Sequence, residues 1–364
     1  MPSLSVALLV SAPAWRGSGA SFGKIATGLA RAGHRPLLVT AADDVTRRFV
    51  QQGLPVRQLP LVRTGWRELR EVGRLLREWA PDVVLADAPR DLRLAAAATV
   101  LHRTPIIFRY NLSGRPLPGD PVSRIFFARI AAVVLQSGYA RDRACRTSPW
   151  LMRRPHRVIG NGYDGEALRP DPAAGVRFRQ RHRIPPAQPV ILSGAALYHD
   201  KGYAVALQAV ARLAERRPLT YVVCGDGAER AALEGIAAEL RMPALFLGQL
   251  GASDLADAMN AADVVLHPAP GELFPNLVAE AMARERAVIG VDSGATPELL
   301  GRDGMAGRLV ATDDPELMAS ELEKLLNDPP LRAALGREAR RRILAEFPLE
   351  RMERDYVTLF EEWG

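Results

Sequence analysis

Two carboxylates, Glu272 and Glu280, stand eight residues apart at the start of an apolar stretch that ends near residue 300. Phe274, Pro275 and Asn276 between them predict a helix start, because the amide that proline lacks would have no partner in a first helical turn. Amides at a helix N-terminus bind phosphate oxygens, and a carboxylate in the first turns can accept hydrogen bonds from ribose hydroxyls. The spacing therefore suits a nucleotide diphosphate.

The same stretch also allows a purely structural interpretation. Leu277, Val278, Ala281 and Met282 are the apolar positions of a short buried helix. Acidic residues near a helix N-terminus are common because the helix dipole favours them. A buried helix with two solvated glutamates would need no ligand, so spacing alone supports both interpretations equally.

A lysine supplies a cation that a phosphate site could use. The sequence holds 45 Arg and only 3 Lys, and Lys201 stands where a predicted strand over 190–193, Gly194 and a short loop lead into a predicted helix. A cation at a helix start opposes the helix dipole, which is easier to understand if an anion offsets it. We favour phosphate binding by Lys201 over the alternative of a solvated loop lysine.

Alternating short strands and helices surround these residues. Apolar runs at 219–224, 244–247, 264–267 and 287–291 predict strands, each followed by a turn and a helix. This order is typical of a doubly wound α/β fold, in which ligands bind beyond the carboxyl ends of the strands. His267 has no second histidine nearby, so we interpret it as packed or exposed and not as a metal ligand. No Asp-x-Asp pair is present, which predicts a site without a metal.

The first half of the chain repeats this pattern. Apolar runs predict five strands there, at 5–10, 36–40, 83–87, 106–110 and 131–135. Gly17 and Gly19 form a Gly-rich turn before a predicted helix over 21–32, and by themselves they indicate only a tight turn. Arg109 and Asn111 stand at the end of the fourth strand, where doubly wound folds bind ligands.

Length predicts the domain organisation. A chain of 364 residues with 48% hydrophobic residues is long enough for two domains. We predict a first domain over residues 1–170, a second over 171–345 that begins with a Pro- and Arg-rich linker at 171–189, and a C-terminal helix over 346–364.

Cysteine content and hydropathy predict a cytoplasmic location. Cys145 and Cys224 are the only cysteines, which favours a reducing compartment and argues against a disulfide framework. No apolar run approaches the roughly 18 residues that span a bilayer. The start of the chain resembles a strand more than a signal peptide.

Charge is distributed unevenly along the chain. Residues 1–170 carry 26 basic and 12 acidic residues, net +14, and the remainder is net −7, which gives +7 for the chain. A basic half indicates an anionic partner such as phospholipid, a phosphorylated glycolipid or nucleic acid. Nucleic acid is the least supported of these, because no nucleic-acid motif is visible and only 6% of residues are aromatic. We therefore expect no nucleic-acid partner.

One predicted helix is a candidate for membrane contact. Residues 66–79 alternate apolar residues with Arg67, Arg70, Arg74 and Arg77, as in basic amphipathic helices that lie on membranes. Glutamates at salt-bridge spacing favour an ordinary surface helix instead. Peripheral binding at the inner face of the cytoplasmic membrane is thus an option that the sequence leaves open.

Taken together, these motifs resemble the donor-site signature of glycosyltransferase family 4. The similarity lies in Glu272-x7-Glu280, the Ala-Met-Ala segment at 281–283, the strand that follows and Gly-x-x-Pro-Glu at 294–298. An Ile-x-Asn-Gly-x-Asp run at 159–164 is similar to one that marks the end of the first domain in that family. The resemblance implies the GT-B fold, in which two doubly wound Rossmann-type domains face each other across a cleft. The first domain would bind the acceptor, the second would bind a nucleotide-sugar donor, and the C-terminal helix would cross back onto the first domain.

The resemblance also implies roles for individual residues. Glu280 would bind the ribose, Lys201 and the amides of Leu277 and Val278 the diphosphate, and Glu272 the sugar hydroxyls. The loop of Gly248, Gln249 and Leu250 would hold the nucleobase. The remaining residues that the resemblance places in the donor site are Phe274, Pro275, Asn276, Gly194 and Ala196, and Gly17 and Gly19 would lie in the cleft.

Two positions depart from the family pattern. The family's usual phosphate-binding Arg is Ala196 here, and Asn111 stands where a His is often found after the fourth strand. Arg109, two residues before Asn111, is a candidate to supply the lost positive charge. We therefore group Glu272, Lys201, Asn111 and Arg109 as the candidate catalytic residues.

The expected activity is transfer of a sugar from a UDP- or GDP-linked donor to a hydroxyl of a cell-envelope glycolipid or polysaccharide precursor. The resemblance implies a retaining, metal-independent reaction with no cofactor besides the nucleotide sugar. Two alternatives are a nucleotide-sugar epimerase, which has a similar two-domain fold, and a catalytically silent nucleotide-binding homologue.

Overall fold

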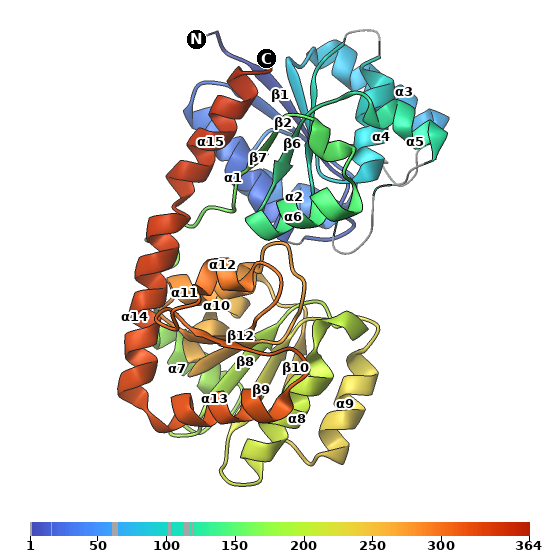
Figure 1. The fold of residues 1–364 in the computed structure, drawn as a ribbon. Coiled ribbons are helices and arrows are strands. Elements are labelled where there is room, and N and C mark those ends of the chain that lie inside the picture. Colours follow the sequence, from blue (N-terminus) through green and yellow to red (C-terminus); the bar gives the residue numbers. More distant parts are fainter. Residues whose placement is uncertain (1, 16, 60–64, 101–102, 113–116, 118–119) are drawn as a thin grey trace. The chain divides into compact units, whose positions relative to one another are not determined.

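The computed structural model describes residues 2–364 except 16, 60–64, 101–102, 113–116 and 118–119. The chain divides into two compact units (Figure 1). The first contains Met1–Gly162 together with Leu349–Gly364, and the second contains Tyr163–Pro348. The predicted boundary at residue 170 thus differs from the observed division, which follows Gly162.

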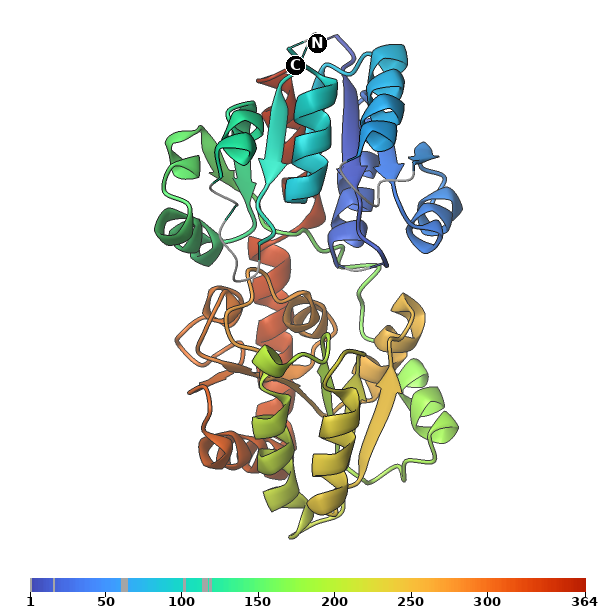
Figure 2. The same ribbon diagram turned by 90° about the vertical axis from the view of Figure 1, so that its right-hand side faces the viewer.

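The described part of the first unit forms a seven-stranded parallel sheet in the order β3-β2-β1-β4-β5-β6-β7. Its strands are β1 Ser5–Val10, β2 Arg35–Thr40, β3 Val56–Gln58, β4 Val83–Ala86, β5 Ile106–Arg109, β6 Ile130–Leu135 and β7 His156–Val158. Its helices are α1 Gly17–Arg31, α2 Asp43–Gln51, α3 Trp66–Trp79, α4 Pro89–Ala98, α5 Pro121–Phe127, α6 Gly138–Thr147, the 3₁₀ turn η1 Leu151–Arg153 and α15 Leu349–Glu361. The helices cover both faces of the sheet (Figure 2).

The second unit forms a six-stranded parallel sheet in the order β10-β9-β8-β11-β12-β13. Its strands are β8 Val190–Gly194, β9 Thr220–Cys224, β10 Ala244–Gly248, β11 Val264–His267, β12 Ala287–Val291 and β13 Arg308–Val310. Its helices are α7 Pro172–Arg181, the 3₁₀ turn η2 His199–Lys201, α8 Tyr203–Ala214, α9 Arg230–Glu239, α10 Ala252–Ala261, α11 Asn276–Ala283, α12 Thr296–Leu300, α13 Pro315–Asn327 and α14 Pro329–Glu346. The predicted α/β class with two doubly wound sheets is confirmed.

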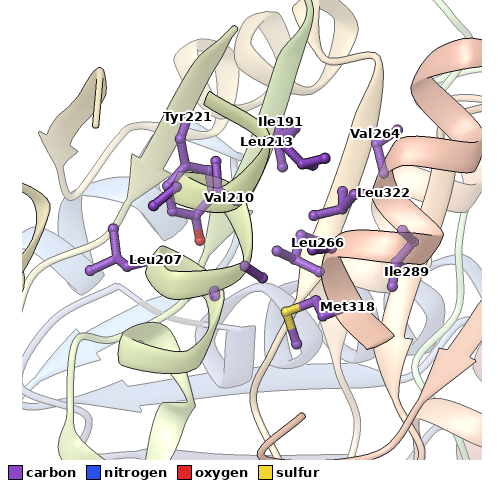
Figure 3. Close-up of a cluster of buried hydrophobic side chains, with 14 of the residues drawn as sticks. Ile191, Leu207, Val210, Leu213, Tyr221, Val264, Leu266, Ile289, Met318 and Leu322 are labelled. Carbon is purple, nitrogen blue, oxygen red and sulfur yellow. The ribbon is translucent and has the colours of Figure 1, made fainter. Parts of the chain in front are cut away.

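Apolar side chains fill the layers between strands and helices, as the continuous hydrophobic runs of the strands require in a sheet that is covered on both faces. Figure 3 shows one such layer in the second unit, where residues of α8 and α13 pack against the strands. In the first unit, α15 packs against α1, and Tyr356 and Phe360 are buried in the same cluster as residues of β1 and α1. The last helix therefore completes the core of the first unit.

The strand order places a topological switch point in each sheet. In the second unit the chain moves outward from β8 to β9 and β10, then returns to β11 on the other side of β8. The loops after β8 and β11 therefore leave the sheet in opposite directions, and the crevice between them is where doubly wound folds bind ligands. In the first unit the switch point lies between β1 and β4.

Two sequence predictions about local structure are wrong. The expected linker at 171–189 contains helix α7, because the Asp171 side chain accepts a hydrogen bond from the amide of Ala174 (3.0 Å) and Pro172 suits the first turn. Gly17 and Gly19, expected in a turn, lie in the first turn of α1. Gly19 packs against the ring of Trp15, 3.2 Å from where a Cβ atom would stand, which explains the glycine without a ligand.

Within the described ranges, none of the helices is both long enough and apolar enough to cross a membrane.

Candidate functional site

Lys201 and Glu272 meet at the switch point of the second unit. Lys201 ends the turn η2 in the loop after β8, and Glu272 lies in the loop after β11. The Lys201 Nζ atom donates a hydrogen bond to Glu272 Oε1 at 2.8 Å, and the two side chains are 16% and 20% exposed. The pair thus connects the two loops that border the crevice, and both groups remain accessible to a ligand.

The backbone of Glu272 is held in place by the loop after β12. Gly294 has a φ angle of +66°, and a Cβ atom on it would lie 2.7 Å from both the N and O atoms of Glu272. The amide of Ala295 donates to the Glu272 carbonyl at 2.9 Å, and the amide of Gly271 donates to Ser293 Oγ at 3.2 Å. Only glycine therefore fits at position 294. These contacts fix the backbone position of Glu272, from which its side chain extends.

His267, the last residue of β11, is buried next to Glu272. Its side chain is 1% exposed, and its Nε2 atom is 3.7 Å from Glu272 Oε2. Burial lowers the pKa of His267, the Glu272 carboxylate opposes that shift and the Lys201 ammonium adds to it. The imidazole is therefore neutral near pH 7. The sequence indicated a histidine that is not a metal ligand but did not reveal its approach to Glu272.

The first turn of helix α11 presents backbone amides at the same edge of the sheet. The first helical hydrogen bond of α11 runs from the amide of Ala279 to the carbonyl of Pro275 at 3.2 Å. The amides of Leu277 and Val278 therefore have no acceptor within the helix. A Cβ atom on Gly194 would lie 3.2 Å from the Leu277 side chain, so this helix start is next to the end of β8. The geometry suits an anion.

Glu280 lies in the second turn of α11 and is half-buried. Its carboxylate is 4.0 Å from the guanidinium of Arg284, the residue that caps the C-terminus of α11. Glu272, in the loop after β11, and Glu280, in α11, thus lie on one continuous segment that begins at the switch point.

Phe274 belongs to the core and not to a binding surface. Its ring is buried, stacks on Tyr163 with centroids 6.4 Å apart and meets Phe347 edge to face at 5.6 Å. The Phe274 ring is therefore occupied in the core, and a place for this residue in the donor site stays a prediction. Pro275 and Val278 are also buried, and Asn276 Oδ1 accepts a hydrogen bond from the Tyr163 hydroxyl at 2.8 Å. These residues fix the start of α11.

The loops after β8, β9 and β10 lie side by side. The amide of Leu197 donates to the Asp226 carbonyl at 3.0 Å, and the amide of Gly225 donates to the Gly248 carbonyl at 2.7 Å. Ala196 is half-buried in the first of these loops. In the loop after β10, Gln249 is exposed and Leu250 half-buried.

Sequence reasoning missed a basic residue at these loops. Arg230, the first residue of α9, donates from Nη2 to the Phe246 carbonyl at 3.1 Å, and its Nη1 atom lies 3.1 Å from where a Cβ atom of Gly248 would stand. The available signal was a cation at a helix start, the same signal that pointed to Lys201.

Arg109 does not replace the missing arginine. Its side chain is 1% exposed, pairs with Asp87 at 2.9 Å and donates to Asn161 Oδ1 at 3.1 Å. The guanidinium is therefore committed to a buried ion pair in the first unit, and the hypothesis that it supplies a spare positive charge is wrong. Asn111 is exposed and donates to the second oxygen of Asp87 at 3.3 Å.

A second carboxyl group of the first unit is fully buried. Asp91 accepts a hydrogen bond at Oδ2 from the amide of Ser11 at 3.3 Å, and its Oδ1 atom has no partner in the described part of the chain. Burial raises the pKa of Asp91 to about 7, against the opposing hydrogen bonds from Ser11. Near neutral pH this group is thus poised between its charged and neutral forms.

The described residues contain no group of three or more His, Cys, Asp or Glu side chains that could hold a metal ion.

Two family models match successive parts of the chain. The model described as "Glycosyl transferase 4-like domain" matches residues 16–162, and "Glycosyl transferases group 1" matches residues 177–342. The second match includes Lys201, Glu272 and Glu280.

Curated relatives and solved structures agree with these matches. A 2-deoxystreptamine glucosyltransferase of Streptomyces kanamyceticus is 32% identical over 45% of this chain and 47% of its own length. A phosphatidyl-myo-inositol mannosyltransferase of Mycolicibacterium smegmatis is 38% identical over 39% of this chain and 37% of its own. The chain thus matches less than half the length of these relatives.

The structural comparison covers nearly the whole chain. The Anabaena protein HepE, solved in complex with UDP-glucose, has a TM-score of 0.86 at 19% identity and covers 99% of this chain and 100% of its own. With both family models and this shared architecture, the chain belongs to the GT-B glycosyltransferases of the group 1 and family 4 type.

Proposed function

We propose that this protein transfers a sugar from a nucleotide-sugar donor to a hydroxyl acceptor, and that the second unit binds the donor. The observation that carries the proposal is the meeting of Lys201, Glu272 and the first turn of α11 at the switch point between β8 and β11. One cation and a helix N-terminus suit a diphosphate, and a half-buried carboxylate beside them suits sugar hydroxyls.

We propose the residue roles that the family resemblance implies. Lys201 and the amides of Leu277 and Val278 bind the diphosphate and stabilise the charge that develops on the leaving group, without a metal. Glu280 accepts hydrogen bonds from the ribose, and Glu272 accepts them from the transferred sugar. The loop of residues 248–250 holds the base. The complex of Anabaena HepE with UDP-glucose supports a nucleotide sugar as donor.

The acceptor and the stereochemistry are further parts of the proposal. The basic first half supports an anionic acceptor such as a phosphorylated cell-envelope glycolipid or polysaccharide precursor. Names among the relatives include both a phosphatidylinositol mannosyltransferase and a glucosyltransferase of a small aminocyclitol. Retention of configuration is proposed from the family resemblance.

A binding experiment tests the donor site. A panel of UDP- and GDP-linked hexoses is screened by thermal shift, and the best ligand is measured by calorimetry on the wild type and on Glu280→Ala. We expect the variant to stay folded and to lose affinity by about tenfold or more, as loss of hydrogen bonds to a charged group does. Unchanged affinity in a folded variant would refute the assignment of Glu280.

Product analysis separates the alternatives. An epimerase converts the donor without any acceptor, whereas a transferase releases nucleotide diphosphate and needs an acceptor for sustained turnover. A silent homologue binds the nucleotide sugar and turns over neither.

We also propose that helix α3 contacts an anionic lipid surface. Arg67, Arg70, Arg74 and Arg77 are all exposed and, at 100° per residue, fall within an arc of about 80° on one face of α3. Trp66, at the start of this arginine stripe, is 88% exposed. Anionic headgroups complement such a stripe, and tryptophan favours the interface between headgroups and acyl chains.

Apolar groups continue this surface onto the neighbouring helices. A cavity of about 600 Å³ lies between α3, α4 and α5. Its apolar lining is Trp66, Leu69, Leu94, Ala97 and Phe126, and its wall also contains Arg93, Asp120 and Ser123. Ile125 of α5 is 70% exposed. An apolar hollow beside a row of arginines is the combination that an anionic bilayer, with charged headgroups over acyl chains, would fit.

Vesicle binding tests the lipid surface. Replacing Arg70, Arg74 and Arg77 by Gln should weaken binding to anionic vesicles by about tenfold or more, since each basic residue near a membrane contributes roughly 1 kcal/mol. In the control variant, Gln replaces Arg177, Arg212 and Arg216, which are three exposed arginines of the second unit. Both variants therefore have the same change in net charge. Equal binding by the two variants would contradict the proposal.

A further inference from the structure

The Nε2 atom of His267 is a buried polar atom without a hydrogen bond in the described residues. Such atoms are rare in native proteins and call for an explanation. The side chain is 1% exposed, so solvent does not supply a partner. Its closest charged neighbour is Glu272, with Oε2 at 3.7 Å, slightly beyond hydrogen-bond range.

The two carboxylate oxygens of Glu272 face different partners, Lys201 at hydrogen-bond distance and His267 slightly beyond it. Oε1 accepts the short bond from Lys201 at 2.8 Å, while Oε2 points toward His267. Because the backbone of Glu272 is clamped by Gly294 and Ala295, the carboxylate can move only by rotation of its side chain. A shift of about 0.8 Å toward His267 would bring Nε2 and Oε2 to the usual hydrogen-bond distance of about 2.9 Å.

A diphosphate would compete with Glu272 for Lys201. A phosphate oxygen that accepts a bond from Nζ weakens the attraction between Nζ and Glu272, and a half-buried carboxylate that loses its partner is destabilised. Among the described residues, His267 has a buried ring nitrogen without a hydrogen bond, 3.7 Å from Oε2 of this carboxylate. Its neutral imidazole can carry a proton on Nε2 and donate it in a hydrogen bond without any change in charge.

We infer that His267 is a positioning residue that donates a hydrogen bond from Nε2 to Glu272 when the donor's diphosphate engages Lys201. This inference rests on the proposed function and deepens it, because it explains how one lysine serves both a carboxylate and a phosphate. Glu272, held by His267, keeps its charge and faces the sugar hydroxyls. His267 thus contributes to recognition of the sugar and not of the nucleotide.

The test compares two polar replacements of His267. The side-chain amide of Gln reaches the position of Nε2, whereas that of Asn reaches only the position of Nδ1. Affinities are measured by calorimetry for the UDP- or GDP-hexose that the panel selects and for the matching UDP or GDP. We expect His267→Asn to weaken nucleotide-sugar binding by about tenfold, with nucleotide-diphosphate binding within about threefold of wild type, and His267→Gln to restore the sugar-dependent part.

A second background distinguishes positioning from a structural role. In Glu272→Gln, which lacks the charged carboxylate, His267→Asn should cause no further loss of sugar-dependent affinity. The same loss in both backgrounds, or a His267→Asn variant that matches wild type, would overturn the role of His267 while leaving the donor site intact. A wild-type protein that binds neither ligand would overturn the donor site and this inference with it. If His267→Asn does not fold, His267→Phe keeps the ring volume without either nitrogen and takes its place.

Discussion

Lys201 pairs with Glu272, the carboxylate that we propose binds the sugar, and the alanine at position 196 increases the importance of this lysine. If the chain is an active transferase, Lys201→Ala should reduce turnover by about 10²-fold or more, as removal of one preorganised electrostatic contact does. Ala196→Arg should leave turnover level or raise it, because the half-buried Ala196 lies in the loop that leads to Lys201. Release of nucleotide diphosphate, with and without acceptor, measures both.

The outcome also discriminates between an enzyme and a silent homologue. In a silent homologue neither substitution changes a turnover that is already absent, and only nucleotide affinity responds. Full activity in Lys201→Ala would contradict the phosphate role of this residue.

Asp91 should make the stability of the first unit depend on pH. Because its pKa is raised to about 7, the folded state binds more protons than the unfolded state between about pH 4 and 7. The stability that protonated Asp91 contributes is complete below its unfolded pKa and is lost as pH rises through 7. Asp91→Asn, which stays neutral, should gain about 2–3 kcal/mol relative to wild type between pH 5 and pH 8.

Denaturant unfolding of the two proteins at both pH values checks this. Asp142→Asn is the control, because Asp142 is exposed, and its stability relative to wild type should not change between pH 5 and pH 8. Asp87→Asn is unsuitable as a control, because Asp87 is paired with Arg109. A pH-independent difference between wild type and Asp91→Asn would show that the carboxyl group keeps one charge state throughout.

Individual residues were predicted from sequence with uneven success, for a physical reason. Lys201 could be singled out because lysine is rare in this chain and a cation opposes the dipole at a helix start, and Glu272 because of its eight-residue spacing from Glu280. The burial of Phe274 and Arg109 was not predicted, because burial depends on partners remote in sequence: Tyr163 and Phe347 for the first, Asp87 and Asn161 for the second. The role that we infer for His267 could not be predicted either, since it depends on the distance between its Nε2 atom and Glu272 Oε2 in the folded chain.

At the scale of elements, the turn after β12 should be as important for donor binding as the side chains it supports. Gly294→Ala would place a Cβ atom 2.7 Å from the Glu272 backbone and also disfavour the positive φ angle. We expect nucleotide-sugar affinity to fall by about tenfold or more, because an altered backbone misplaces the carboxylate.

Gly33→Ala is the matched control for the backbone effect. Gly33 has a φ angle of +84°, but a Cβ atom there would meet nothing within 4 Å. That variant should lose about 1–2 kcal/mol of stability and keep full affinity. Equal nucleotide-sugar affinity in Gly294→Ala and Gly33→Ala would show that donor binding tolerates a shift of the Glu272 backbone.

The strands that sequence analysis missed all lie at the edges of the sheets. β3 and β7 are the two edges of the first sheet and β13 is an edge of the second, and each has only three residues. Edge strands are short and partly exposed, so they lack the continuous apolar run that identifies an inner strand. The inner strands, buried on both faces, were all predicted to within about a residue or two.

At the scale of the whole molecule, the first unit depends on the end of the chain. Phe360 of α15 is fully buried in a cluster with residues of β1 and α1. Phe360→Ala should destabilise this unit by about 3–5 kcal/mol, as large-to-small core changes do. Exposed Arg354→Ala, in the same helix, should stay within about 0.5 kcal/mol of wild type.

Hydrogen exchange resolved by segment locates the effect. Protection should fall in α1 and β1, more than 300 residues away in sequence, and stay unchanged in β8 and β9. Loss of protection confined to α15 would show that this helix is an independent attachment.

The discontinuity of the first unit also bears on its synthesis. A ribosome delivers residues 1–162 first, but the helix that covers Phe22, Ile25 and Leu29 of α1 begins only at Leu349. At roughly 5–20 residues per second, the intervening segment takes about 10–40 s to make. During that interval these apolar residues of α1 stay uncovered in the nascent first unit, while the sequence of the second unit is complete before the helix that covers them begins.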